Sequence, residues 1–231
     1  MSLLLFVFIL LACVIGGVYW FIKKRFIGYT EYTKRMLQPQ QEHFLANMSQ
    51  YANTEAWIKS LNRSKMSTLM KFHKTLGDKP EKVYDDQTIT IEKYTLSLRL
   101  LFLVIRHELS FHGFTVWDIC QRIMHLCFSI GGETIVIRDK TKRLVCWSHL
   151  LYHKETCRVM WFYKDPCYET KTNLWMLVVF LSVDHVFKLN KARQTIKTID
   201  LGPSSIEGLK KLKMECGFPE VAQADVAKYY E

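Results

Sequence analysis

The hydrophobic residues of the chain gather first in one run close to its beginning. Residues 3–22 read LLLFVFILLACVIGGVYWFI, a stretch of 20 residues without a charged side chain. A helix of about 20 apolar residues spans the roughly 30 Å hydrocarbon core of a bilayer. A cleaved signal peptide normally has a basic start and a small-residue cleavage site, and a buried globular helix normally keeps one polar face. The run has none of these features, so the pattern predicts a transmembrane anchor over residues 1–25.

Positive charge flanks this run on one side only. Residues 23–25 read KKR, whereas only Met1 and Ser2 precede the run. Because basic flanks stay on the cytoplasmic side, we expect a single-pass protein whose N-terminus lies outside and whose domain lies in the cytosol. Its membrane lipid contact would be made through residues 3–22. The two N-glycosylation sequons, at Asn47 and Asn62, are then expected to stay unmodified.

The pattern after the anchor is helical up to residue 76. Apolar residues recur at helical spacing, Thr54 stands where a helix cap is expected, and Gly77 ends the run. This pattern predicts a juxtamembrane helical segment over residues 26–53 and the start of a folded domain at residue 54.

The rest of the domain alternates between helical and extended patterns. Residues 139–142 (DKTK) are typical of a hairpin turn, and Ser204 and Gly217 are expected to start and end the last helix. Helices, antiparallel strands, a helix, a strand and a helix follow one another, which predicts an α+β domain with a mixed sheet. It should cover residues 54–220, before a tail over 221–231. The expected strands are residues 83–91, 134–138, 144–152, 157–163 and 195–201, and the expected helices are 96–112, 115–129, 172–188 and 204–216.

Composition narrows the surroundings of this domain. The formal net charge is +10, and Lys and Arg are spread along the chain rather than clustered, apart from residues 23–25 and 210–213. Such a surface suits an anionic membrane leaflet better than sequence-specific nucleic-acid binding, which we do not expect. The seven cysteines are odd in number and irregular in spacing, which favours reduced thiols over a disulfide framework.

Three short stretches resemble a known fold. They are residues 57–66 (WIKSLNRSKM), 198–204 (TIDLGPS) and 212–218 (LKMECGF). In this order and spacing they are similar to motifs of the GCN5-related N-acyltransferase (GNAT) fold, and most of all to its branch with the Fem-type peptidyltransferases. The likeness covers about residues 54–218.

The resemblance implies transfer of an acyl group from a thioester, or of an aminoacyl group from tRNA, to an amine. In such folds the strand before the long apolar helix, here residues 157–163, splays from its neighbour and admits the donor. The start of that helix then holds the pyrophosphate. Lys171, Thr172 and Lys213 are the donor contacts that the resemblance implies, with acyl-coenzyme A as the cofactor. Residues 164–171 (KDPCYETK) contain no glycine, which argues against close approach of the backbone to phosphate.

The implied reaction needs a base for the amine and an acid for the leaving group. Asp165 and Glu169 flank the implied donor site, although a turn aspartate and a first-turn glutamate have purely structural explanations. Tyr163 could protonate a thiolate, or it could be a half-buried core residue. Asp200 ends a strand, where it either acts chemically or caps the next turn. Lys213 is either a ligand contact or a solvated lysine.

Four potential metal ligands follow one another along the predicted strands. Cys146, His149, His153 and Cys157 are all residue types that bind zinc. Side chains alternate along a strand, so Cys146 should face away from His149 and His153. The spacing therefore predicts no metal site.

Three functions from different classes stay open. The first is a membrane-anchored acyltransferase acting on an amine. The second is a catalytically degenerate member of the fold that serves as a membrane-tethered interaction domain, which the missing glycine favours. The third is a small structural subunit of a membrane assembly.

Overall fold

One mixed sheet organises the part of the chain that the structure describes. In this computed structural model the described residues are 42–77, 82–111, 126, 132–192, 195–204 and 206–230. All of them belong to the unit formed by residues 39–231. The sheet has eight strands in the order β2-β3-β4-β5-β6-β7-β1-β8. The strands are β1 (His43–Asn47), β2 (Lys82–Tyr84), β3 (Gln87–Lys93), β4 (Glu133–Arg138), β5 (Leu144–His153), β6 (Thr156–Lys164), β7 (Thr198–Asp200) and β8 (Glu220–Val221).

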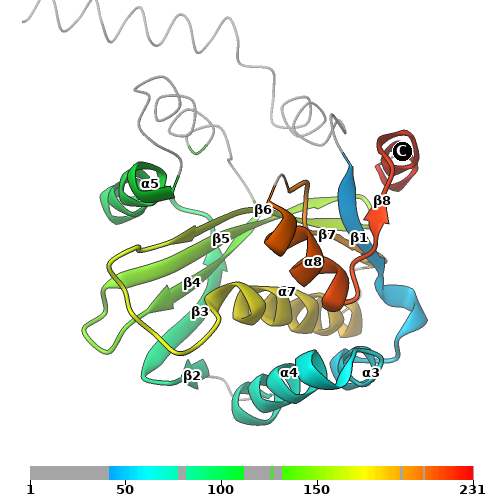
Figure 1. Ribbon diagram of the computed structural model, residues 1–231, viewed down its shortest axis with the longest axis horizontal. Helices are drawn as coiled ribbons and strands as arrows, with labels where there is room; N and C mark the ends of the chain where they lie inside the picture. The colour runs from blue at the N-terminus through cyan, green and yellow to red at the C-terminus, as the bar shows by residue number, and fades with distance from the viewer. Residues whose placement is uncertain are drawn as a thin grey trace, which may run out of the picture. The chain divides into compact units, whose positions relative to one another are not determined.

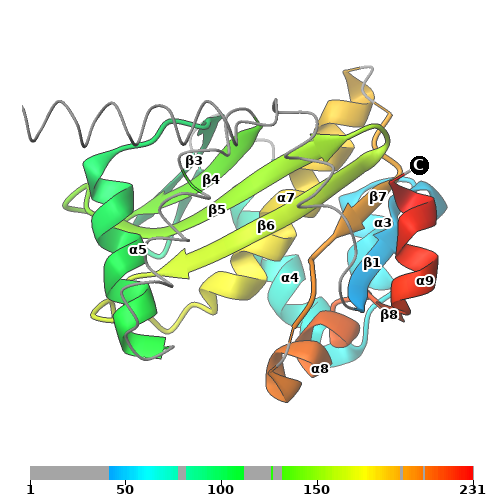
Figure 2. The same ribbon diagram turned by 90° about the horizontal axis from the view of Figure 1, so that it is seen from above.

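Helices cover both faces of this sheet. The helix α7 lies against one face, with α3 and α4 packed on it, and α5 lies against the opposite face (Figures 1 and 2). Along β4, Ile135 and Ile137 belong to the core on the α7 side, whereas Val136 belongs to the smaller core under α5, because successive side chains point to opposite faces. The helices are α3 (Thr54–Lys59), α4 (Arg63–Leu76), α5 (Leu98–Phe111), α7 (Leu174–Lys191), α8 (Glu207–Glu215) and α9 (Gln223–Val226), and the short 3₁₀ helices are η1 (Met48–Gln50) and η2 (Ala227–Tyr229).

The helix α7 connects β6 to β7, which is the one parallel pair among the described strands. Parallel neighbours need a long crossover, and an apolar helix covered by the sheet and by other helices can be buried on nearly all sides. Asn173 starts α7 by accepting the Met176 N–H at 3.1 Å. The buried Asp184 within it is paired with Lys82 at 3.0 Å and with Lys188 at 2.9 Å. The Lys82 contact ties α7 to β2, and the Lys188 contact lies within α7.

The α+β class and the mixed sheet predicted from the pattern are confirmed. The helices expected at 96–112 and 172–188 are α5 and α7, and the antiparallel strands expected at 134–138 and 144–152 are β4 and β5. Asp139 holds their turn by accepting the backbone N–H groups of Thr141 and Arg143. The strands expected at 157–163 and 195–201 are β6 and the shorter β7.

The expected single strand over residues 83–91 is wrong, because two strands occupy this region. Asp85 and Asp86 have φ angles of 51° and 61°, and a two-residue turn with positive φ folds a chain back into a hairpin. Here the turn joins β2 to β3. Aspartate tolerates the left-handed conformation better than most residues, so the turn signal was present in the sequence.

The helical interpretation of residues 30–76 is also wrong in part. Residues 43–47 form β1, which pairs with both β7 and β8. Phe44, Leu45 and Ala46 are all buried, since a central strand is covered on both faces. Such a continuous apolar run cannot be distinguished from a helix by periodicity. The sheet therefore extends beyond the domain start expected at residue 54.

Side-chain caps differ from the expected ones at three helix starts. Asn53, rather than Thr54, caps α3, and Asn62 caps α4 after a break in the expected helix. No side chain caps α8, whose cap residue is Ile206 rather than the expected Ser204. Gly77 and Gly217 stand at the ends of α4 and α8 with positive φ, as expected.

The C-terminal residues join the fold instead of forming a separate tail over 221–231. Val221 of β8 pairs with His43, and α9 and η2 follow. The Tyr230 hydroxyl then donates a hydrogen bond to Asp200 in β7. The boundary expected at residue 220 thus falls inside the sheet.

Some predictions fall on residues outside the described ranges. They are the anchor over 1–25, residues 26–41 of the juxtamembrane segment, and the helix over 115–129, of which only Leu126 is described. Within the described ranges, no helix combines the length and the hydrophobicity that a bilayer crossing requires.

Candidate functional site

The strands β6 and β7 run together only at the start of β6. Their pairing joins Thr156 to Thr198, Cys157 to Ile199 and Arg158 to Asp200. From residue 159 to 164, β6 still pairs with β5, but no described strand continues beside it on the β7 side. At about 3.3 Å per residue this edge is roughly 20 Å long. The parallel pair that the resemblance implies is present, but β7 pairs along its whole length and ends at Asp200, so the splay itself stays a prediction.

A bulge lies at the start of this edge. Ser148 pairs with Phe162 and Leu150 pairs with Val159, so that two residues of β6 stand opposite His149 of β5. The Ser148 hydroxyl donates to the Trp161 carbonyl at 2.6 Å and holds the bulge in place. Bulges twist a strand away from its neighbours and are enriched next to active sites. Here the bulge follows the last residue of β6 that pairs with β7.

Asp200 collects donors at the fork between the two strands. His43 Nδ1 lies 2.8 Å from its Oδ2, and the Tyr230 hydroxyl donates to the same oxygen. Arg158 Nε is 3.7 Å from Oδ2, and the Gly202 N–H donates to Oδ1 at 2.6 Å. Asp200 is fully buried. We call Asp200, His43, Arg158 and Tyr230 the fork cluster.

The fork cluster keeps its carboxylate ionised. Burial alone would raise the pKa of Asp200, but the hydrogen bond from His43 and the charge of Arg158 together hold this pKa below its usual range. A carboxylate with a lowered pKa and occupied oxygens is a poor proton acceptor. The arrangement suits Asp200 to orient His43 instead, because a carboxylate bound to one ring nitrogen fixes the imidazole tautomer.

Lys213 lies beside this cluster and fastens the turn after β7. Its Nζ donates to the carbonyl oxygens of Leu201 and Gly202, both at 2.9 Å, and to that of Pro203 at 3.0 Å. Its ammonium also lies 4.9 Å from the centre of the Phe44 ring. Burial lowers the pKa of Lys213 to about 8, against the opposing effect of the Asp200 charge. The side chain is 2% exposed and donates to three carbonyls, so the expected solvated lysine is wrong, and the contact with a donor stays a prediction.

Asp165 organises a second group of charges at the other end of β6. Its carboxylate accepts a hydrogen bond from Arg106 at 3.1 Å and a shorter one from Arg143. The Asp165 side chain is 1% exposed, whereas Arg106 and Arg143 are 43% and 44% exposed. Asp165 is therefore the anchor of two arginines that reach solvent.

The loop from Asp165 to α7 uses its own N–H groups internally. The Cys167 N–H donates to Asp165 Oδ1 at 3.0 Å, and the Thr172 N–H donates to Thr170 Oγ1 at 3.1 Å. The first turn of α7 is capped by Asn173. A pyrophosphate bound by this loop would have to replace these hydrogen bonds, and the loop has no glycine that would ease such a change.

The remaining predicted site residues are spread over three surroundings. Tyr163 is buried under α5, stacked on Trp147 with ring centres 6.0 Å apart. The Thr172 hydroxyl donates to Asp85 at 3.0 Å, which ties the loop to the β2–β3 turn. Glu169 and Lys171 are exposed on that loop. Their chemical roles stay predictions. Among the predicted site residues, Asp200 and Lys213 come together from different elements.

Sequence reasoning missed the other three members of the fork cluster. His43 lies in the stretch interpreted as helix, and Tyr230 lies in the expected tail. Arg158 had a usable signal, because an arginine inside an otherwise apolar strand needs a buried partner. Nothing local in the sequence says that this partner is Asp200.

The four potential metal ligands are separated in the fold. Cys146 and Cys157 are buried in the core on the α7 side, His149 is stacked between Trp147 and Trp161, and His153 meets the Tyr230 carbonyl at 3.1 Å. Within the described residues, no group of three or more His, Cys, Asp or Glu side chains could hold a metal ion.

Solved structures with a similar arrangement share little sequence with this chain. L-PGS from Bacillus licheniformis is 12% identical with a TM-score of 0.41, over 78% of this chain and 57% of that one. The C-terminal DUF2156 domain of a proposed lysylphosphatidylglycerol synthetase from Agrobacterium fabrum is 10% identical with a TM-score of 0.46, over 78% and 57%. A tandem GNAT protein from the clavulanic acid biosynthesis pathway is 7% identical with a TM-score of 0.49, over 80% and 54%.

The chain thus spans little more than half the length of these structures. No protein-family model and no curated protein sequence matches it. The topology of β6, α7 and β7 is consistent with a GNAT-like fold.

Proposed function

We propose that this chain is a membrane-anchored acyl- or aminoacyltransferase that holds an extended donor along the edge of β6 and transfers its acyl group to an amine. The observation that carries the proposal is the edge of β6 after Arg158, which has no described strand beside it because β7 ends at Asp200, with a bulge at Met160 and Trp161. A strand edge without a neighbouring strand offers N–H and C=O groups with which an extended amide-containing ligand can pair as an added strand. At Lys164, the last residue of this edge, both backbone groups already contact the His107 ring.

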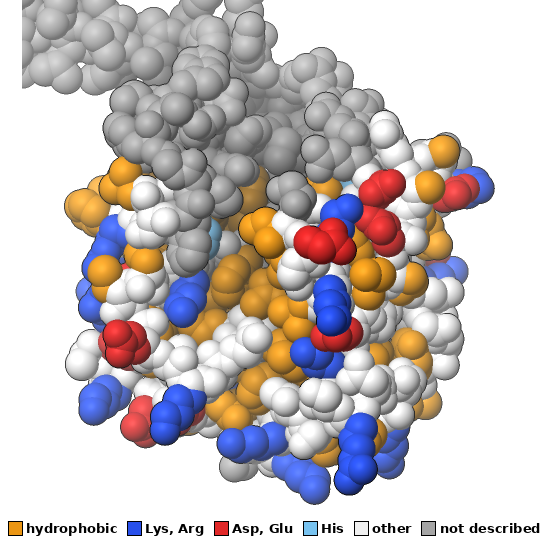
Figure 3. All heavy atoms as spheres, in the orientation of Figure 1, with side chains coloured by type: hydrophobic (Ala, Val, Ile, Leu, Met, Phe, Trp, Pro, Cys, Tyr) orange, Lys and Arg blue, Asp and Glu red, His pale blue; other side chains and the backbone are white. Residues whose placement is uncertain are grey.

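The surroundings of this edge suit a ligand of mixed polarity. In Figure 3, hydrophobic side chains are visible in the middle of the view. They lie between the charged side chains at the place of α8, right of centre, and the charged side chains at the left, where Figure 1 shows the ends of the strands. The residues along the edge, from Val159 to Lys164, are mostly half-buried. A site with apolar walls and a few polar groups is typical of small-molecule binding.

The transfer step assigns a role to the fork cluster. The amine nitrogen attacks the donor carbonyl, a C–N bond forms, and the C–S bond of a thioester or the C–O bond of an aminoacyl ester breaks. The amine loses a proton, which we assign to His43, and the departing thiolate or alkoxide takes up a proton. The His43 side chain is 2% exposed, so the amine must enter the fork beyond Arg158 to reach its Nε2, which accepts the proton when Nδ1–H donates to Asp200. Asp200 is then a positioning residue.

The membrane anchor in this proposal is supported by the sequence alone. Residues 3–22 would insert into lipid, and the basic residues that follow would keep the domain on the cytosolic side. The acceptor amine would then be met at or near the membrane surface.

One observation favours the second function, a degenerate interaction domain. The N–H groups of Cys167, Thr172 and Met176 already donate within the loop and its cap. A donor that depends on a backbone phosphate cradle would therefore find it occupied. Binding measurements separate the two functions.

The first experiment titrates the full-length chain, in a non-ionic detergent, with acetyl- and long-chain acyl-coenzyme A by calorimetry. Binding in the micromolar range is expected. Lys171→Gln, in the loop before α7, should weaken it about three- to tenfold by removing one charge-assisted contact. Lys191→Gln, at the other end of the same helix, is the matched control and should leave it unchanged.

The same titration with aminoacyl-tRNA covers the other donor class. With whichever donor binds, His43→Gln should lower kcat at least about 100-fold, as expected for loss of a general base, and should change the donor Kd little. A folded chain that binds neither donor would overturn the transferase proposal and favour the interaction domain.

A further inference from the structure

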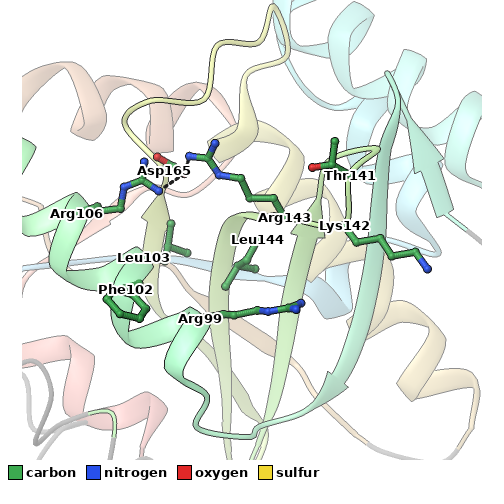
Figure 4. A pocket seen from close by; sticks show the side chains of 9 residues that line it. All are labelled: Arg99, Phe102, Leu103, Arg106, Thr141, Lys142, Arg143, Leu144 and Asp165. Atoms are coloured by element: carbon green, nitrogen blue, oxygen red, sulfur yellow. Dashed lines mark hydrogen bonds and ion pairs between the residues drawn. The ribbon is translucent and has the colours of Figure 1, made fainter.

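A pocket of about 380 Å³ lies between α5 and the β4–β5 hairpin. Figure 4 shows Arg106 and Arg143 converging on Asp165, while Arg99 extends from the same helix as Arg106 and Lys142 lies at the rim. Three arginines and one carboxylate therefore line the pocket, an excess of two positive charges, while the Lys142 side chain extends outward from the rim. The lining residues are Arg99, Phe102, Leu103, Arg106, Thr141, Lys142, Arg143, Leu144 and Asp165.

Asp165 positions two guanidinium groups without using all their hydrogen-bonding capacity. Each guanidinium carries five N–H donors. One nitrogen of Arg106 and one of Arg143 contact the Asp165 Oδ2 atom, and both side chains are more than two-fifths exposed. The remaining donors can reach a ligand, and the buried carboxylate holds the two groups in place for it.

Arg99 and Lys142 add positive charge without a counter-ion of their own. Arg99 and Arg106 are two turns apart on one side of α5, as expected for positions i and i+7. Within the described residues, the Arg99 and Lys142 side chains have no ion pair and no hydrogen bond. Lys142 has a φ of 63°, which is rare for a residue with a side chain. Its backbone N–H donates to the Asp139 carbonyl at 2.9 Å, so the turn fixes Lys142 at the rim.

The apolar side chains of the pocket narrow the class of ligand that can bind there. Phe102 and Leu103 lie between the two arginines of α5, and Leu144 faces them from β5. Phe102 is 65% exposed. Planar guanidinium groups that bind two oxygens at once favour phosphate over a halide, and the apolar side chains offer a contact surface to the group that carries the phosphate.

We propose that this pocket binds a phosphate or diphosphate group of a small ligand. The pocket lies on the β5 side of β6, whereas the edge assigned to the acyl donor lies on the β7 side. The inference rests on the charges of this pocket and does not depend on the transfer reaction. Phosphate chemistry is shared by soluble diphosphates and phospholipid headgroups, so the test includes both.

The experiment titrates the full-length chain in non-ionic detergent at low ionic strength with inorganic pyrophosphate as the probe. The wild-type chain should bind it, and Arg99→Gln should weaken binding about tenfold, because it removes a charged donor whose side chain has no described partner. Lys140→Gln is the matched control. Lys140 is exposed in the same hairpin turn but does not line the pocket, and its loss should change Kd less than about twofold.

Two further probes distinguish the source of the phosphate. Adenosine diphosphate represents a soluble diphosphate, and glycerophosphoglycerol represents a phospholipid headgroup. If either probe binds, and if its binding weakens in Arg99→Gln but not in Lys140→Gln, the result supports phosphate binding in this pocket and identifies the class of ligand. Absence of binding for all three probes, or equal binding by the two variants, would overturn the proposal. Equal thermal unfolding temperatures of the unliganded variants show that a changed Kd does not reflect unfolding.

Discussion

Two buried aspartates, at opposite ends of the strand β6, each gather basic side chains. Around Asp200 the partners are buried as well: the Arg158 side chain is 10% exposed and that of His43 is 2% exposed. Around Asp165 the partners are the half-exposed Arg106 and Arg143, which line an open pocket.

The difference decides what each group can do. A buried carboxylate whose hydrogen-bond donors are also buried contributes to the stability of the fold and can orient a neighbouring side chain. Substituting such a carboxylate removes the charge that compensates its buried partners. A buried carboxylate whose partners reach water holds them ready for a second anion, because solvent can compensate them when the ligand is absent. The same residue types thus form a closed cluster at one end and a binding surface at the other.

The largest expected effect follows from opening the closed cluster. Asp200→Asn removes the carboxylate charge beside the buried Arg158 and places an amide against the donors of His43 and Tyr230. We expect a loss of about 3–5 kcal/mol in the free energy of unfolding, as for other buried pairs that lose one partner. Denaturant unfolding followed by tryptophan fluorescence measures it. A loss below about 1 kcal/mol would mean that the cluster does not stabilise the fold.

Asp165→Asn is the matched change at the other end and should cost less. Its arginines can turn to water, so we expect about 1–2 kcal/mol, close to the loss of one charged hydrogen bond. The same denaturation series checks it. If Asp165→Asn cost as much as Asp200→Asn, the contrast between a closed and an open group would not hold.

Tyr230→Phe tests whether the C-terminal residues contribute to the closed cluster. It removes one hydroxyl donor to Asp200 and leaves the other donors in place, for an expected loss of about 1 kcal/mol. The exposed Tyr229 provides the control, since Tyr229→Phe should change the free energy of unfolding by less than about 0.5 kcal/mol. Equal effects of the two variants would remove Tyr230 from the cluster.

The smallest expected effect is a pH dependence in the acid range. The pKa of folded Asp200 lies below its ordinary value of 3.8. The unfolded chain therefore takes up this proton first, and the stability supplied by Asp200 is present above pH 3.8 and is lost as the pH falls through the folded pKa. Denaturant unfolding measured from pH 5 down to the lowest pH at which the chain stays folded should show a free energy of unfolding that declines less steeply for Asp200→Asn than for the wild type. An unchanged slope would contradict the role given to the His43 and Arg158 contacts.

Local patterns were sufficient for most of the fold. The alternation in β4 and β5, the turn at Asp139 and the apolar run of α7 are features of neighbouring residues, and each predicted element is present. The errors arose where burial hides periodicity or where a two-residue turn reverses the chain. The strand β1 is apolar on both faces, and the turn at Asp85 and Asp86 splits what had been interpreted as one strand.

The candidate site could be predicted only in part, because its partners are far apart in sequence. Asp200 was identified from the strand end, but its partner His43 lies 157 positions away. Asp165 was identified beside the donor loop, whereas its arginines come from α5 and from the connection between β4 and β5. Only the three-dimensional arrangement shows that the first aspartate is enclosed and that the second faces a pocket.

The position of β1 in the sheet has a consequence for biosynthesis. Leu45 pairs with Asp200, and His43 pairs with Val221. A ribosome that adds about 5–20 residues per second needs roughly 8–30 s to extend the chain from Leu45 to its partner Asp200. During that time an apolar segment with strand-forming potential is exposed beside other nascent chains. This protein is therefore expected to depend on chaperones early in its synthesis, more than a fold whose first strand pairs with the next one.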